Sequence, residues 1–202
     1  MGDSEQLRQL EARIESLTAE KNLAVFALDM AAELGALQRR PDMVPSLDAI
    51  LEATTAKLRS LMRFKVLAFQ LVDEDSADFF IAWCDPQEMS SFIEEETNLL
   101  IEDKTFAWVL GRSRPQVITA SDGETRLLLH SLSTPARTRG MFVGVLDQDP
   151  AEILDIAQAL LSVLLRSCAN TIESFELYRY IENINLDLRA SHEEAGIRDT
   201  VV

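Results

Sequence analysis

The stretch DPAEILDIAQALLSVLLRSCANTIESFELYRYIENINLDLRAS, residues 149–191, sets the architecture of this chain. Its first residues, Asp149-Pro150-Ala151-Glu152, predict a helix start. Asp can accept from the first free N–H groups, Pro has a helical φ at N1, and Glu can reach back to the cap. Neither Gly nor a further Pro follows before Ser191, so we expect one uninterrupted helix. Such a helix spans roughly 60 Å, about twice the width of a small domain. Its first half can pack on a core, and its second half must project.

The projecting half carries an apolar seam. Its members follow a 4-3-4 spacing, the a/d pattern of a coiled coil, with charged residues between them. They are Leu177, Ile181, Ile184 and Leu188. A seam of this kind beyond the end of a domain is expected to lie against an identical helix.

A second seam lies near the N-terminus, where residues 4–37 are expected to form a helix. Its members follow a 3-4-3 spacing and weaken toward the domain. They are Leu7, Leu10, Ile14 and Leu17. The alternative is a plain amphipathic helix that lies along its own core. With both seams, we expect a parallel homodimer.

The composition limits the function classes. The chain has 202 residues, 47% of them hydrophobic, and a formal net charge of −15. It is therefore expected to fold, and its acidic surface disfavours nucleic acids and anionic membrane surfaces. No apolar run is long enough for a membrane span, and the N-terminus does not fit a signal peptide. Cys84 and Cys168 form no metal or redox spacing, so we expect a reduced cytoplasmic protein.

Between the terminal helices, some segments have the apolar spacing of a helix and others have the apolar pattern of a strand. Helices are expected from residue 44 or 46 to 62, over 85–100, where Asp85-Pro86 reads as a second helix start, and over 105–110. Strands are expected over 64–72, 79–84, 115–119, 126–132 and 141–146, the first two as an antiparallel hairpin. This order predicts an α+β fold with one antiparallel sheet of five or six strands and helices at its ends and on one face.

Three stretches resemble a GAF domain, the small-molecule sensory module of signalling proteins. Residues 105–118 look like its short helix and turn before a strand, and Gly140 to Leu146 resembles its "G-x-x-x-G-V-L". Leu177-Tyr178 ends the closing helix as "L-Y" does in many members. The resemblance implies a profilin-like sheet extended by coiled-coil helices. A PAS domain is the nearest alternative, but it usually lacks a core-packed closing helix of this length.

The resemblance divides the chain into an N-terminal coil (1–42), a GAF-like domain (43–178) and a C-terminal signalling coil with its tail (179–202). It implies a cytoplasmic, bacterial-type signalling protein whose output domain would follow Val202. It names no cofactor, because the family's cyclic-nucleotide, bilin and haem signatures are not present. Six residues are candidates for lining a ligand pocket. For the aromatic ones, an equal alternative is that their rings only fill space in the core. The six candidates are Phe80, Trp83, Cys84, Phe106, Trp108 and His130.

No catalytic arrangement is visible. The chain shows no nucleophile set with supporting motifs, no phosphate-binding glycine loop and no metal-ligand spacing. His130 is expected to be a half-buried structural residue, Cys84 a small core residue, and Glu94-Glu95-Glu96 a solvated helix face. We therefore expect a regulatory domain rather than an enzyme. The alternatives are a ligand-free dimerisation module of the same fold and, least favoured, a methionine sulfoxide reductase that uses Cys84.

Overall fold

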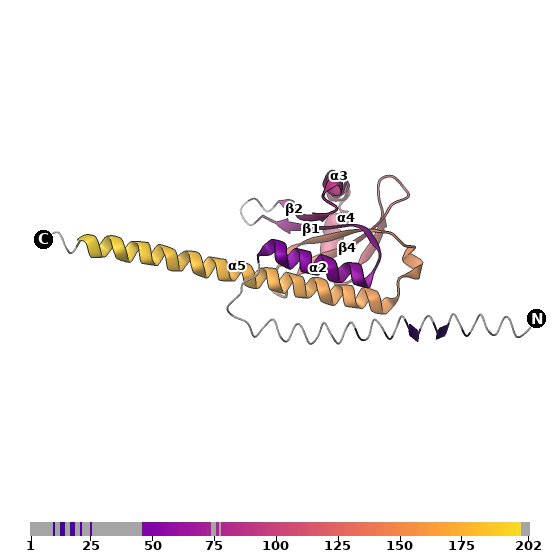
Figure 1. The fold of residues 1–202 in the computed structure, drawn as a ribbon. Coiled ribbons are helices and arrows are strands. Elements are labelled where there is room, and N and C mark those ends of the chain that lie inside the picture. The colour runs from indigo at the N-terminus through magenta and orange to yellow at the C-terminus, as the bar shows by residue number, and fades with distance from the viewer. Residues whose placement is uncertain are drawn as a thin grey trace, which may run out of the picture.

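The computed structural model describes residues 46–73, 76 and 78–198, together with seven residues near the N-terminus (10, 13, 14, 17, 18, 21 and 25). For 187 and 189–198 it describes the backbone alone. Figure 1 shows a sheet with helices on both faces and one long helix that continues well beyond it.

The five strands form one antiparallel sheet in the order β2-β1-β5-β4-β3. Their bounds are β1 Phe64–Val72, β2 Phe79–Asp85, β3 Gln116–Thr119, β4 Arg126–Ser133 and β5 Thr138–Leu146. The predicted strand positions are confirmed to within a few residues. The central strands β1, β5 and β4 are buried along most of their length, as expected for strands covered on both faces.

Two helices, α2 (Leu47–Leu61) and α5 (Asp155–Arg198), lie side by side on one face of the sheet (Figure 1). The short 3-10 turn Gln87–Met89 leads into α3 (Ser90–Glu102), which covers the other face with α4 (Thr105–Leu110). The expectation of helices on one face is therefore wrong. The α+β sheet itself is confirmed, and the reason for two covered faces is that β1 and β5 are apolar on both sides.

The long helix begins later than predicted. Asp149 does accept from Ala151 N at 2.9 Å, but the turn that it caps is a 3-10 turn, Pro150–Glu152. Ile153 then takes an extended conformation and enters the core under α5. Burial of Ile153 outweighs the continuous helical pattern, so α5 starts at Asp155 and runs for 44 residues.

In the second Asp-Pro motif, by contrast, the aspartate side chain caps no helix. The carboxylate of Asp85 accepts from Arg59 Nε and Nη2 at 3.0 and 2.8 Å, and Arg59 Nη1 donates to the carbonyl of Phe64. Asp85 therefore joins the end of α2 to the ends of β1 and β2. The sequence pattern could not show this partner, because Arg59 lies on another element.

The centre of the sheet depends on a close backbone contact at Gly140. A Cβ on Gly140 would lie 1.9 Å from the carbonyl oxygen of Gln70 on the neighbouring strand β1. No side chain fits there without moving the strands apart.

A membrane-spanning segment is not found among the helices of the described residues.

Candidate functional site

The structure separates the six pocket candidates. Phe106 and Cys84 lie in the core between the sheet and the α3–α4 layer. Trp83 packs on the opposite face, beneath α2 and α5. A register shift between β1 and β2 sets these orientations. Phe69 pairs with Trp83 and Gln70 pairs with Ile81, so one extra residue of β2 bulges out between the two pairs.

Three other candidates also lie away from the α3–α4 core. Phe80 is exposed and pairs with Leu71 at the edge of the sheet. His130 pairs with Phe142, a member of the α2–α5 core. Trp108 is exposed on α4, with the guanidinium of Arg112 4.4 Å from its ring centre. The six residues therefore do not line one common pocket.

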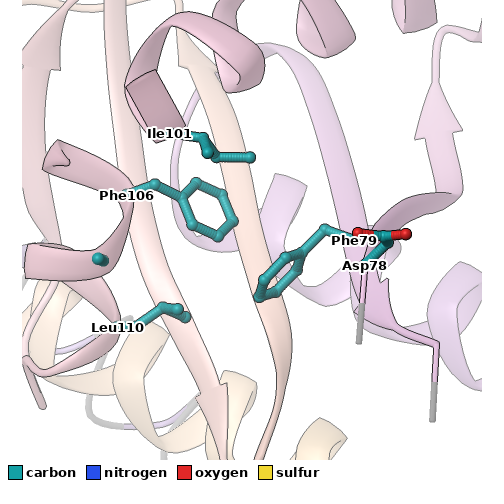
Figure 2. Close-up of a pocket in the computed structure, with 6 residues that line it drawn as sticks. Asp78, Phe79, Ile101, Phe106 and Leu110 are labelled. Atoms are coloured by element: carbon teal, nitrogen blue, oxygen red, sulfur yellow. The ribbon is translucent and has the colours of Figure 1, made fainter. Parts of the chain in front are cut away.

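A pocket of about 320 Å³ opens at the edge of the α3–α4 face. Figure 2 shows the rings of Phe79 and Phe106 facing each other, with Ile101 and Leu110 on either side. The ring centres are 4.7 Å apart, and the planes of the two rings meet at 74°, an edge-to-face arrangement. Asp78 and Ala107 complete the lining. The volume lies at the lower end of the range for small-molecule sites, so the pocket suits a compact and mostly apolar ligand.

The sequence identified only Phe106 among these lining residues. Phe79 belonged to a predicted strand, but the side it faces depends on the bulge. Ile101 lay just beyond the predicted 85–100 helix, and Leu110 ended the predicted 105–110 helix. Neither could be assigned to a pocket, because the distance between α3 and α4 is a tertiary property.

The rest of the α3–α4 face is filled by side chains. Ile93, Phe106, Val109, Met141 and Val143 are all buried there.

Two buried polar contacts fasten α3 to the sheet. Gln70 Nε2 donates to Thr97 Oγ1 at 2.6 Å. Glu96 accepts from the backbone N and the hydroxyl of Ser121. The prediction of a solvated Glu94-Glu95-Glu96 face is wrong for Glu96, which is buried. A glutamate inside the α3 face needs hydrogen-bond donors, and the loop after β3 provides them.

His130 lies in the core rather than in a pocket. Its Nδ1 is 2.7 Å from the carbonyl oxygen of Ser131. Burial lowers the pKa of His130, the backbone of Ser131 and Ser113 opposes this shift, and nearby Arg166 adds to it. The imidazole is therefore kept neutral beneath α5. It is more deeply buried than the half-buried residue that the sequence predicted.

Both cysteine thiols are buried. Burial raises the pKa of Cys84, and it raises the pKa of Cys168 to about 11. A raised thiol pKa lowers the fraction of reactive thiolate. In the part of the chain that the structure describes, no three His, Cys, Asp or Glu side chains gather as a metal site requires.

The C-terminal seam lies on a helix that leaves the domain. Among the α5 side chains that the structure describes, Ile172 is the last buried one, and Leu177, Ile181, Ile184 and Leu188 are exposed. In the N-terminal seam, Leu10, Ile14 and Leu17 are helical and exposed, whereas Leu7 lies outside the described residues. These side chains are free to meet a partner helix, and their pairing stays a prediction.

An ionic cluster marks the place where α5 leaves the sheet. Arg139 of β5 has a side chain that is only 4% exposed. It pairs with Glu176, and its Nη2 lies 3.4 Å from a Glu173 oxygen. Arg137 reaches the same two carboxylates at 3.6 and 3.9 Å. This cluster was not among the residues predicted from the sequence. Its signal is an Arg in an apolar strand and two Glu one helical turn apart on α5.

Comparison with solved structures shows which known fold the sheet and its helices resemble. The GAF domain/HD domain protein from Geobacter sulfurreducens is similar to 68% of this chain and 99% of its own, with a TM-score of 0.52 and 16% identity. The chain has a GAF-like fold. The GAF domain of a two-component sensor histidine kinase from Bacillus halodurans matches 66% of this chain and 97% of its own, at a TM-score of 0.49 and 16% identity. No family model matches this chain, and no curated protein does.

Proposed function

We propose that this chain is a sensory or regulatory GAF-type domain of a cytoplasmic signal-transduction protein. It acts as a homodimer, and it relays a small-molecule or partner signal to an output domain beyond Val202. The observation that carries this proposal is α5 itself. One helix forms part of the domain core and then continues outward with an exposed apolar seam.

The mechanism follows from the stiffness of a helix. Leu161, Leu165 and Ile172 hold the first half of α5 against the sheet. A shift of the sheet therefore moves the projecting half as a rigid rod, because neither Gly nor Pro occurs in α5 before Gly196, two residues from its end. The cluster of Arg139, Glu173 and Glu176 joins strand β5 to α5 at the place where α5 leaves the sheet.

The signal enters through the α3–α4 face. The pocket between Phe79 and Phe106 lies on this face, and β1 and β5 form the floor of the same core. A ligand that orders α4 against β2 would change how these strands pack. The strands carry the change to the α2–α5 face, because alternate residues of one strand contact both layers.

The filled α3–α4 core favours one second candidate. Because Ile93, Val109, Met141 and Val143 already occupy the space beneath the helices, the domain can serve as a ligand-free dimerisation module. In that case the signal is a movement of a neighbouring domain, and the small edge pocket has no role. A sulfoxide reductase is less favoured, because the Cys84 thiol is buried and its pKa is raised.

Two measurements on the full chain test the proposal. Sedimentation should show a dimer at micromolar concentration, and a monomer at all concentrations would overturn both candidates. A thermal-shift screen with nucleotides, tetrapyrroles and amino acids should find a compound that raises the melting temperature, because a ligand that binds the folded state stabilises it. A dimer that no compound stabilises would favour the ligand-free module.

Neighbouring phenylalanines provide a matched control for the pocket. Phe79→Ala removes a pocket wall, whereas Phe80→Ala removes an exposed ring at the sheet edge. For any compound found in the screen, the first variant should weaken binding at least tenfold and the second should leave it unchanged. Equal effects of the two variants would place the compound elsewhere. Methionine sulfoxide turnover that Cys84→Ser abolishes would instead support the reductase.

A further inference from the structure

We propose that one corner of the domain is a docking surface for a short acidic peptide segment of a partner protein. The surface consists of Lys104, Trp108, Arg112 and Arg114, which lie on α4 and at its two ends. We call it the α4 corner. This proposal goes beyond the proposed function, because it requires neither the dimer nor the pocket at the edge of the α3–α4 face.

The first observation is an excess of positive charge in one segment of an acidic chain. The whole chain has 34 Asp and Glu residues against 19 Lys and Arg residues. Residues 104–121 contain Lys104, Arg112 and Arg114 but no Asp or Glu. All three cationic residues are exposed. The segment therefore presents local positive charge on a protein whose formal net charge is −15.

The second observation is that, among the residues that the structure describes, no carboxylate pairs with the three cations of the α4 corner. This differs from another segment without acidic residues, 53–72. There, Arg63 lies 3.5 Å from a carboxylate oxygen of Glu152, and Lys65 lies 3.8 Å from one of Asp147. Carboxylates of other elements thus balance the charge of that segment. At the α4 corner, a partner can supply them.

The third observation is the exposed indole of Trp108. Figure 2 shows the ring of Phe106 directed at Phe79 across the pocket. Trp108 lies two residues further along α4, about 200° around the helix, so it faces away from the pocket. It is 46% exposed. The guanidinium of Arg112 lies 4.4 Å from its ring centre, and this contact holds a charged group beside an apolar surface.

Hydrogen bonds hold the turn after α4 against the sheet. Ser131 Oγ donates to the carbonyl of Arg112 at 3.1 Å, and Gln116 Nε2 donates to the carbonyl of Arg114 at 3.1 Å. The pairing of β3 with β4 reaches only Leu129, so the turn meets β4 just beyond that pairing. Both arginine side chains therefore extend from a fixed backbone, which lowers the entropy lost when a partner binds.

The combination of cations and an indole specifies the class of partner. Carboxylates form bidentate pairs with guanidinium groups, and an apolar side chain can pack on the exposed part of Trp108. Trp and Arg are over-represented among the residues that dominate protein interfaces. Nucleic acids need a longer track of cations. Here Glu102 and Asp103 precede the cationic segment and Asp122 and Glu124 follow it. The corner therefore fits a short peptide that combines acidic residues with an apolar one.

Peptide binding to the full chain tests this inference. The probe is a short fluorescein-labelled peptide of glutamates with interspersed leucines, and the matched probe has glutamine in place of every glutamate. Fluorescence anisotropy should show saturable binding of the acidic probe that weakens as salt is added. The glutamine probe should bind at least about tenfold more weakly. Equal affinities for the two probes, or no binding of the acidic one, would overturn the inference.

A matched pair of double variants separates the α4 corner from the overall charge. Arg112→Gln with Arg114→Gln removes two positive charges from the corner, and Arg63→Gln with Lys65→Gln removes two from the start of β1. The first double variant should weaken binding of the acidic probe at least about tenfold, and the second should change it less than about twofold. Equal weakening by both would overturn the inference. Thermal unfolding checks that both variants fold.

Trp108→Ala tests the apolar part of the surface. The side chain is exposed, so the fold should be retained. The variant should weaken binding of the leucine-containing probe at least about fivefold, and an unchanged affinity would contradict the proposed surface. A single-stranded oligonucleotide that binds the corner more tightly than the peptide would also overturn it. A dimer in sedimentation without peptide binding would refute this inference and leave the proposed function standing.

Discussion

Replacement of Ile181 by Ala should weaken the dimer, whereas the same replacement at Leu186 should not. The two side chains are exposed to almost the same extent in one chain, 56% for Ile181 and 57% for Leu186. They differ in direction, because five residues turn a helix by about 140° between them. Only Ile181 lies on the seam.

The size of the effect follows from the area that a partner would cover. Full burial of an isoleucine side chain is worth about 1.5–3 kcal/mol, and about half of Ile181 is still exposed. The loss of its branched end should therefore cost about 1 kcal/mol per chain. Both copies carry the change, so the dimer loses about 2 kcal/mol, which raises its dissociation constant about 30-fold.

The assay is sedimentation equilibrium over a dilution series of the full chain and the two variants. Ile181→Ala gains somewhat more helix propensity than Leu186→Ala, so propensity cannot account for a selective loss of the dimer in the Ile181 variant. Far-ultraviolet circular dichroism checks that α5 stays helical. A dimer that Ile181→Ala leaves unchanged, or one that Leu186→Ala weakens equally, would refute the assignment of the seam.

Three further predictions concern the domain itself. Gly140→Ala should destabilise the fold by more than about 3 kcal/mol in urea unfolding, because the new Cβ meets a backbone oxygen at 1.9 Å, whereas Gly111→Ala, with its nearest neighbour at 3.6 Å, should cost less than about 1 kcal/mol. Burial lowers the pKa of His130 from 6.5, so as the pH falls the unfolded chain binds a proton at this residue before the folded chain does. The wild type should therefore lose stability as the pH falls below about 6.5. His130→Gln should reduce this pH dependence of the unfolding free energy, and an identical profile would contradict the prediction. Arg139→Met should cost about 2 kcal/mol in thermal unfolding, less than the loss of a fully buried pair, because Glu173 and Glu176 reach solvent; an unchanged melting temperature would show that the cluster does not stabilise the domain.

The sequence identified the elements of the fold well, because their signals are local. The nine-residue stretch of β1, apolar except for Lys65 and Gln70, predicts a buried central strand, and the observed strand has the predicted bounds. Gly140 lay just before the predicted last strand, 141–146, and the structure places it within β5, against Gln70. A long uninterrupted helix was also predictable, because neither Gly nor Pro occurs between Asp155 and Ser191, although α5 continues through Gly196 to Arg198.

The candidate site was harder to predict, because it depends on which face a side chain takes. Trp83 and Phe106 were expected near one pocket, yet the bulge in β2 places Trp83 beneath α5. A bulge leaves no clear trace in the local apolar pattern. Ile101 and Leu110 reach the pocket only because α3 and α4 fold against each other.

The sequence by itself determined that this chain has a long helix with an apolar seam, since the spacing of Leu177, Ile181, Ile184 and Leu188 is a property of the helix alone. Only the tertiary structure decided which part of that helix is buried and which part faces outward. Ile153 shows the physical reason. Its local pattern favours a helix, but burial in the core is worth more than one further helical residue, so the chain bends there and α5 begins at Asp155.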